Sequence, residues 1–236
     1  MIKRIARTAG FSGLLAALLL TLLQSFWVAP LILQAETYES AAPAVEQHSH
    51  DGEAAVAHEH AAGHEHSEEA WSPEDGWQRI LSTTGGNLVV AVGFALILAA
   101  LYSLREPGRV GTGALWGLAG FAVFCLAPTL GLPPELPGTA AADLGLRQSW
   151  WIGTAASTAA GLALLVFARH WLLKALGVVL LVMPHVIGAP QPEVHASLAP
   201  EALETQFKIA SWLTNAAFWL ALGLLSAWLY RRSSQA

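Results

Sequence analysis

Six apolar stretches, each long enough to cross a lipid bilayer as a helix, constrain the fold of this chain more than any other feature. They cover residues 11–33, 82–104, 110–132, 150–168, 171–189 and 209–230. A spanning helix needs about 17 to 25 residues to cross a hydrocarbon core about 30 Å thick, and in lipid a helix satisfies its own backbone polar groups. Only 12% of the residues are charged, against about 25% in soluble domains. The sequence therefore predicts an all-α fold, a polytopic membrane helix bundle with about six transmembrane helices.

The first and fifth segments each allow a second interpretation. The first follows a basic start, but it stays apolar for over 20 residues, too long for a signal-peptide core of about 7–15. We therefore expect an uncleaved helix. Only Arg169 and His170 separate the fourth segment from the fifth. This short connection predicts either a tight helical hairpin or one long bent helix.

Charged residues divide between the two ends of the predicted helices. One end carries most of the basic residues: Lys3, Arg4, Arg7, Arg105, Arg109, Arg169, Lys174, Arg231 and Arg232. The other end carries all of the 17 Asp and Glu residues except Glu106. Because the distribution of Lys and Arg sets orientation, we expect both termini in the cytoplasm. A model with five helices would place one terminus outside and break this division.

A long polar loop, residues 34–80, separates the first helix (1–33) from the rest of the membrane bundle (81–236). Residues 36–69 are rich in Ala, His and Glu, a composition that cannot build a packed core. We therefore expect a disordered His-rich extracytoplasmic loop. Trp71 and Trp77 lie near its end, where an ordered segment is predicted before the second helix.

The loop is the first candidate metal site because it contains six histidines: His48, His50, His58, His60, His64 and His66. Imidazole suits late divalent metals such as cobalt, nickel, copper and zinc. His58 and His60 point the same way in an extended chain, whereas His60 and His64 share one face of a helix. The alternative is an acidic linker that contacts metal only incidentally. We favour metal capture.

Polar side chains inside the apolar segments form the second candidate site, because such groups are costly in a membrane and often functional. Four of them lie in the outer halves of different helices: Gln24, Asn87, His185 and Asn215. Their shared level predicts a polar vestibule on a transport pathway. Interhelical hydrogen bonds, each worth about 1 kcal/mol, explain Gln24, Asn87 and Asn215 better when each is taken singly. For His185 the two explanations stand equal.

Prolines surround His185 and shape the outer loops. Pro184 leaves a backbone carbonyl of the preceding turn without its donor. An imidazole beside a free carbonyl predicts a stopping place for an ion, which Glu193 and His195 would extend into the outer loop. Glu135 lies in the other proline-rich outer loop. It would face the same vestibule or belong to a rigid cap, and we favour the cap.

Missing motifs exclude several functional classes. The sequence has no Gly-x4-Gly-Lys-Ser/Thr motif and no His-Glu-x-x-His motif, so ATP hydrolysis and zinc proteolysis are not expected. A single cysteine, Cys125, excludes an intramolecular disulfide and a thiolate cage, and we interpret it as a core residue. We expect no enzymatic activity, no permanently bound cofactor and no nucleic-acid partner. The expected ligands are membrane lipid and a transported or captured divalent metal, cobalt or nickel.

Five stretches carry a resemblance to a known family. They are Leu23-Gln24 with Val28-x-Pro30-Leu31-Ile32-Leu33-x-Ala35-Glu36-x-Tyr38-Glu39, Pro73-Glu74-Asp75-Gly76-Trp77, Gly131-Leu132-Pro133-Pro134-Glu135-Leu136-Pro137-Gly138, Arg147-Gln148-x-Trp150-Trp151, and Pro184-His185-x-Ile187-Gly188-Ala189-Pro190-Gln191-Pro192. In these stretches the sequence resembles the CbtA family, the predicted cobalt transporter subunits of bacteria, nearly from end to end.

The resemblance implies cobalt uptake across the inner membrane, linked to cobalamin synthesis. It also implies a small single-helix partner, CbtB, with its own His-rich segment. The family is described with about five helices, and the difference from our count falls on residues 171–189. Two functions remain: a subunit for uptake of a divalent transition metal, or a membrane metal chaperone that presents metal to another permease. We favour uptake of cobalt. A membrane redox enzyme would need cofactor ligands that the sequence does not offer.

Overall fold

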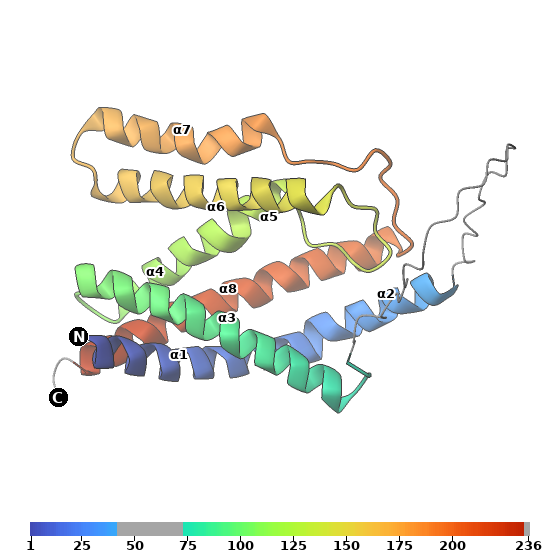
Figure 1. The fold of residues 1–236 in the computed structure, drawn as a ribbon, viewed down its shortest axis with the longest axis horizontal. Coiled ribbons are helices and arrows are strands. Elements are labelled where there is room, and N and C mark those ends of the chain that lie inside the picture. The colour runs from blue at the N-terminus through green and yellow to red at the C-terminus, as the bar shows by residue number, and fades with distance from the viewer. Residues whose placement is uncertain (42–72, 234–236) are drawn as a thin grey trace, which may run out of the picture.

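The computed structural model describes residues 1–41 and 73–233, and these residues form helices joined by short loops (Figure 1). In chain order the elements are α1 (Ile2–Leu23), η1 (Gln24–Val28), α2 (Ala29–Ala41), α3 (Trp77–Leu104), α4 (Gly111–Phe121), η2 (Ala122–Leu126), α5 (Ala127–Gly131), α6 (Leu144–Phe167), α7 (Trp171–Ile187) and α8 (Glu201–Arg232). The elements η1 and η2 are single π-helical turns, so α1–η1–α2 and α4–η2–α5 each form one continuous helix.

The predicted all-α membrane bundle is confirmed. In the described part of the chain, five helices are long and apolar enough to cross a membrane: Ile2–Ala41, Trp77–Leu104, Gly111–Gly131, Leu144–Phe167 and Glu201–Arg232. The fifth predicted segment forms α7, a shorter apolar helix of 17 residues, at the lower limit of spanning length. The difference between five and six helices therefore rests on α7 alone.

Helices α6 and α7 form a tight antiparallel hairpin rather than one bent helix (Figure 1). Ala168 has an extended backbone and ends α6, and His170 caps the start of α7 by accepting a hydrogen bond from Leu172 N. Inside the hairpin, Pro184 cannot donate to the carbonyl of Leu180. Ser157 Oγ on α6 donates to that carbonyl instead, at 2.6 Å. The carbonyl that the sequence predicts to be free for an ion is therefore already bonded.

The helices alternate in direction, which gives the bundle two distinct ends (Figure 1). The start of α1, the end of α8 and the α3–α4 and α6–α7 connections lie at one end, which we call the terminal end. The residues flanking 42–72 and the connections 132–143 and 188–200 lie at the other, which we call the loop end. This alternation follows the charge division in the sequence, because the excess of basic residues lies at the terminal end.

Buried apolar residues form two separate clusters. The inner cluster joins α1, α3 and α8 and contains Ala9, Ala16, Ala17, Leu20, Ala91, Ala95, Leu98, Ala99, Tyr102, Phe218, Trp219, Leu222, Ala227 and Tyr230. The loop-end cluster joins η1, α2, α8 and the two loops that precede α6 and α8. It contains Val28, Ala35, Leu136, Ala199, Leu203, Phe207 and Ala210. Helix α8 therefore passes through both clusters.

Glycines allow α4 to approach α8 at backbone contact distance. A Cβ atom on Gly117 would lie 2.2 Å from the Trp219 carbonyl oxygen, and one on Gly223 would lie 2.2 Å from the Gly113 carbonyl oxygen. The hydrophobic effect is weak between helices in lipid, so association depends on van der Waals packing, and small residues allow the helices to pack closely. Gly161 and Gly177 produce a similar approach between α6 and α7.

The two π-turns occur at the same sequence pattern, Phe-x-x-Ala-Pro. It reads Phe26-Trp27-Val28-Ala29-Pro30 in one helix and Phe124-Cys125-Leu126-Ala127-Pro128 in the other. Proline lacks the N–H that would bond the carbonyl four residues earlier, and its ring clashes with that carbonyl. Each helix widens by one residue at this point: the N–H of Ala29 bonds to the Gln24 carbonyl, and that of Ala127 bonds to the Ala122 carbonyl.

Candidate functional site

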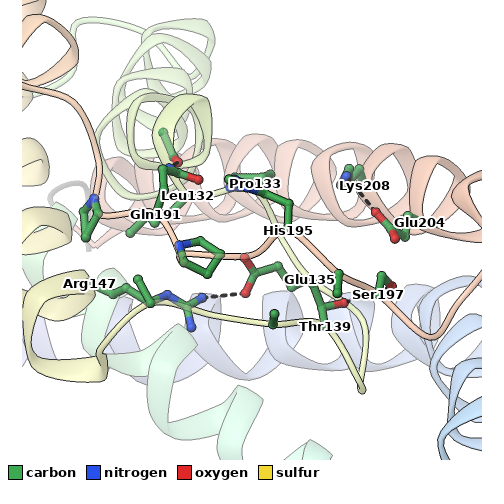
Figure 2. A pocket seen from close by; sticks show the side chains of 16 residues that line it. Leu132, Pro133, Glu135, Thr139, Arg147, Gln191, His195, Ser197, Glu204 and Lys208 are labelled. Atoms are coloured by element: carbon green, nitrogen blue, oxygen red, sulfur yellow. Dashed lines mark hydrogen bonds and ion pairs between the residues drawn. The ribbon is translucent and has the colours of Figure 1, made fainter. Parts of the chain in front are cut away.

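A cavity of about 270 Å³ lies at the loop end, between residues 131–147 and 190–208 (Figure 2). Its polar lining comes from the two proline-rich loops and from the N-terminal parts of α6 and α8. These side chains are Glu135, Thr139, Arg147, Gln191, His195, Ser197, Glu204 and Lys208. The cavity therefore combines two carboxylates, two cations and one imidazole at the end of a membrane bundle.

Backbone hydrogen bonds hold the two loops against each other. Ala140 N donates to Ala196 O at 2.8 Å, and Leu198 N donates to Gly138 O at 3.3 Å, which forms a short antiparallel bridge. Gly138 has a positive φ of 76°, a conformation that glycine adopts without steric cost. Leu136 is buried in the loop-end cluster and fixes the first loop to α8. The cavity walls are thus attached to the helices below.

Two ion pairs neutralise the carboxylates of the cavity. Arg147 Nη2 lies 2.8 Å from Glu135 Oε2, and Lys208 Nζ lies 3.3 Å from Glu204 Oε2. Both pairs are half-buried. His195 is exposed and lines the same cavity, and Figure 2 shows it near Glu135. Glu193 is also exposed, on the loop that leads to His195.

A third ion-pair group ties α2 to the start of α3 at the same end. Arg79 pairs with Glu36 on α2 and, through Nη1 at 2.7 Å, with Asp75. These residues flank positions 42–72, so Arg79 holds the two sides of that segment together. The six predicted metal-binding histidines of the segment lie outside the described residues.

A second group of polar side chains lies inside the bundle and includes Gln24, Asn87 and Asn215, which form hydrogen bonds there. Asn87 Nδ2 donates to Gln24 Oε1 at 2.7 Å and to Thr21 Oγ1 at 3.0 Å. Cys125 Sγ donates to Asn215 Oδ1 at 3.8 Å, and Asn215 Nδ2 bonds to the Ser211 carbonyl of its own helix.

Thr214 on α8 lies at the level of these two contacts. It lies one turn from Ala210 on α8, and Gln24 lies one turn from Val28. Because Val28 and Ala210 share the loop-end cluster, and α1 runs antiparallel to α8 (Figure 1), Thr214 and Gln24 lie at the same level. We call this group the polar layer: Thr21, Gln24, Asn87, Cys125, Thr214 and Asn215.

His185 lies outside the polar layer. It occupies the exposed side of α7 near its end, and its ring contacts Trp150 edge-on at a centroid distance of 6.2 Å. The Trp150 ring packs closely on Gly131, where a Cβ atom would lie 2.4 Å from Cη2, and Gly131 lines the cavity. His185 therefore does not line the cavity but contacts Trp150, which packs on the lining residue Gly131, whereas the other three predicted vestibule residues lie inside the bundle.

Sequence reasoning missed several of these residues. Arg147, Glu204, Lys208 and Gln191 line the cavity but did not stand out in the sequence, although Glu204 and Lys208 have the i, i+4 spacing of a helical ion pair. Cys125, interpreted as a core residue, packs against the inner cluster and also donates to Asn215 in the polar layer. Among the described residues, no group of three or more His, Cys, Asp or Glu side chains is arranged to hold a metal ion.

The fold and these sites define a polytopic membrane protein with a charged cavity at one end and a polar layer within its helices. Compared with known families, the chain matches the one described as probable cobalt transporter subunit (CbtA) over residues 2–231. The chain belongs to this family, as the resemblance in its sequence indicates. No curated protein and no solved structure matches the chain.

Proposed function

We propose that this chain is an inner-membrane subunit for the uptake of divalent cobalt, with the loop end in the periplasm and both termini in the cytoplasm. Membership of the family supports transport of cobalt. The orientation is supported by the basic residues at the terminal end, since Lys and Arg favour the cytoplasmic side. We also propose that the cobalt is used for cobalamin synthesis and that the chain works with a small CbtB-like partner.

The cavity at the loop end is the observation that carries this proposal. It places Glu135 and His195 in one space, at the end of the bundle where the His-rich segment is attached through Ala41 and Pro73. Metal bound by the six histidines would be released next to this cavity. Imidazole and carboxylate are both ligands of cobalt, so the cavity can receive the ion before it enters the bundle.

A membrane metal chaperone is the second candidate function. It would need only the six loop histidines to bind metal, and no pathway through the helices. Uptake of labelled cobalt separates the two functions. Cells that express this chain, alone and then with a CbtB-like partner, should accumulate cobalt if the chain forms a pathway. Cobalt bound at the membrane without accumulation inside would support the chaperone.

Changing all six loop histidines to Ala should weaken uptake only when metal is scarce. The residues to change are His48, His50, His58, His60, His64 and His66. The segment would act by concentrating metal near the cavity, and such an effect disappears once the ion is abundant. We expect the cobalt concentration for half-maximal uptake to rise by about tenfold, equivalent to about 1.4 kcal/mol, with an unchanged maximal rate. A lower maximal rate at saturating cobalt would contradict a capture role.

Changing His195 to Ala should also raise the cobalt concentration for half-maximal uptake, because the cavity would lose its only imidazole among the described lining residues. The expected increase is about three- to tenfold, since one ligand of a weak site contributes about 1 kcal/mol. The control is His170→Ala, which removes a histidine at the terminal end. Identical uptake curves for both variants would contradict a role of the cavity in cobalt uptake.

A further inference from the structure

The terminal end of the bundle carries a group of basic side chains without carboxylate partners. All of them are exposed, and no ion pair among the described residues involves any of them. Glu106, the acidic residue of this end, pairs instead with Arg4 at 2.6 Å. We call this group the basic patch: Arg105 and Arg109 in the α3–α4 connection, Arg169 in the α6–α7 turn, and Lys174 near the start of α7.

A cation–π contact brings the two connections together. The guanidinium carbon of Arg105 lies 4.7 Å from the centroid of the Phe167 ring. Phe167 is the last residue of α6, and Arg169 follows it by two positions, so their Cα atoms are at most about 7 Å apart. Trp116 on α4 contacts the same ring at a centroid distance of 6.3 Å. The α3–α4 connection and the α6–α7 turn therefore meet at Phe167.

The α6–α7 hairpin is attached to the rest of the bundle mainly at its loop-end half. Outside the hairpin, α6 packs chiefly on η2 and α5, which form the loop-end half of the Gly111–Gly131 helix. Toward the terminal end, the Phe167 ring supplies the contacts with α4 and with the α3–α4 connection. A ligand that joined the two connections would therefore strengthen the attachment where packing between helices is least extensive.

Exposed apolar side chains lie next to the basic patch. Leu104, Phe167 and Trp171 are 85%, 45% and 69% exposed, and each lies within two positions of Arg105 or Arg169. A soluble anion would contact the cations alone, whereas a phospholipid would also cover the apolar side chains with its acyl chains. Tryptophan is enriched at the membrane interface, the level at which lipid headgroups lie. The surroundings of the basic patch therefore favour a lipid over a soluble anion.

Arginine is well suited to a phosphate group, because its planar guanidinium can donate two parallel hydrogen bonds to the phosphate oxygens. Basic pockets between transmembrane helices bind anionic headgroups on the cytoplasmic side of membranes. The bias of Lys and Arg toward that side explains why this end is basic. It does not require that arginines from two separate connections meet at one aromatic ring.

We propose that the basic patch binds one anionic phospholipid between the α3–α4 connection and the α6–α7 turn. Arg105 and Arg169 hold its phosphate group, while Arg109 and Lys174 add positive charge around the headgroup. The acyl chains cover Leu104 and the adjacent apolar surface, so the lipid holds the hairpin to the bundle at the terminal end. This inference goes beyond the proposed function and does not depend on which ion is transported.

Thermal unfolding of the full chain in detergent tests the site. A ligand that binds only the folded state raises the unfolding temperature. We expect phosphatidylglycerol, which is anionic, to raise it by about 3–5 °C, and the zwitterionic phosphatidylcholine to leave it unchanged. Native mass spectrometry should show one phosphatidylglycerol molecule retained per chain. Sodium phosphate at the same concentration should have no effect, and an equal shift with phosphate would overturn the lipid in favour of a soluble anion.

Two double variants identify the residues that bind the lipid. Arg105→Gln with Arg169→Gln should lose both the temperature shift and the retained lipid, whereas Lys at the same two positions should keep most of the shift. The matched control is Arg7→Gln with Arg232→Gln. It removes two exposed charges from the same end, including one that lies over an aromatic ring, Trp228, at 5.4 Å.

The control variant should keep the shift of the parent protein. Equal losses in the Gln variant of the basic patch and in the control would show that total charge, and not this site, attracts the lipid. A full shift in the Gln variant of the basic patch would also overturn the proposal. These measurements contain no cobalt, so either result leaves the proposed function to be decided by uptake.

Discussion

Replacing Gly223 with Ala is expected to destabilise the bundle so strongly that most of the protein no longer folds. The new Cβ atom would lie 2.2 Å from the Gly113 carbonyl oxygen and 2.7 Å from the Gly117 nitrogen. Both atoms belong to the backbone, so no side-chain rotation relieves the clash and α4 must move away from α8. Overpacking costs about 1–3 kcal/mol when side chains adjust, and more when they cannot. The yield of monodisperse protein in mild detergent and its thermal unfolding measure the loss.

Gly93→Ala is the matched control for this substitution. It adds the same methyl group to α3, where nothing lies within 4 Å of the new Cβ atom. The intrinsic helix preference of Ala over Gly, about 1 kcal/mol, should leave this variant as stable as the parent protein or slightly more stable. If Gly223→Ala were as stable as Gly93→Ala, the close α4–α8 crossing would be wrong.

Replacing His185 with Ala is expected to abolish cobalt uptake even at saturating metal, while the protein still inserts in the membrane. His185 offers an imidazole beside Trp150, next to the cavity wall at Gly131. If the ion passes along this wall, loss of the ligand blocks a step that more metal cannot restore. The substitution should not unfold the bundle, because one interhelical contact is worth only about 1 kcal/mol.

His170→Ala serves as the control for His185→Ala, since it removes an exposed imidazole from the N-terminus of the same helix. Uptake should be measured for both variants at low and at saturating cobalt, with the amount of membrane-inserted protein determined in parallel. Normal uptake by the His185→Ala protein at both concentrations would show that this histidine has only a structural role, as a contact of Trp150.

The arrangement of partners illustrates what could be predicted from single residues and what could not. Gln24 and Asn87 were predicted to share a level, and they contact each other directly. Asn215 was placed at the same level. Its partner Cys125 was assigned to the core, and it packs against the inner cluster, but its contact with Asn215 was not predicted. Glu135 was assigned to a rigid cap, and the structure adds its ion-pair partner, Arg147, which could not be predicted from the sequence. The depth of a residue in the membrane can be predicted from its position along a helix. Which neighbouring helix it faces cannot be predicted in this way.

The sequence by itself determined the all-α membrane fold, the approximate helix positions and the separation of charges between the two ends. These properties follow from local quantities: the length of apolar runs, the cost of unsatisfied backbone groups in lipid and the positions of Lys and Arg. The Phe-x-x-Ala-Pro pattern is equally local, because proline disturbs the turn that precedes it wherever it occurs in a helix.

Only the tertiary structure decided which surfaces meet. Ser12 and Ser226, separated by 214 positions in the chain, bond to each other and align α1 with α8. That alignment brings Thr214 to the level of Gln24, and the glycine crossing of α4 on α8 brings Cys125 to Asn215. The cavity likewise needs two loops about 60 residues apart to be bridged at Thr139 and Ser197. Packing between helices depends on the shapes of both surfaces at once, so the polar layer and the cavity exist only in the folded bundle.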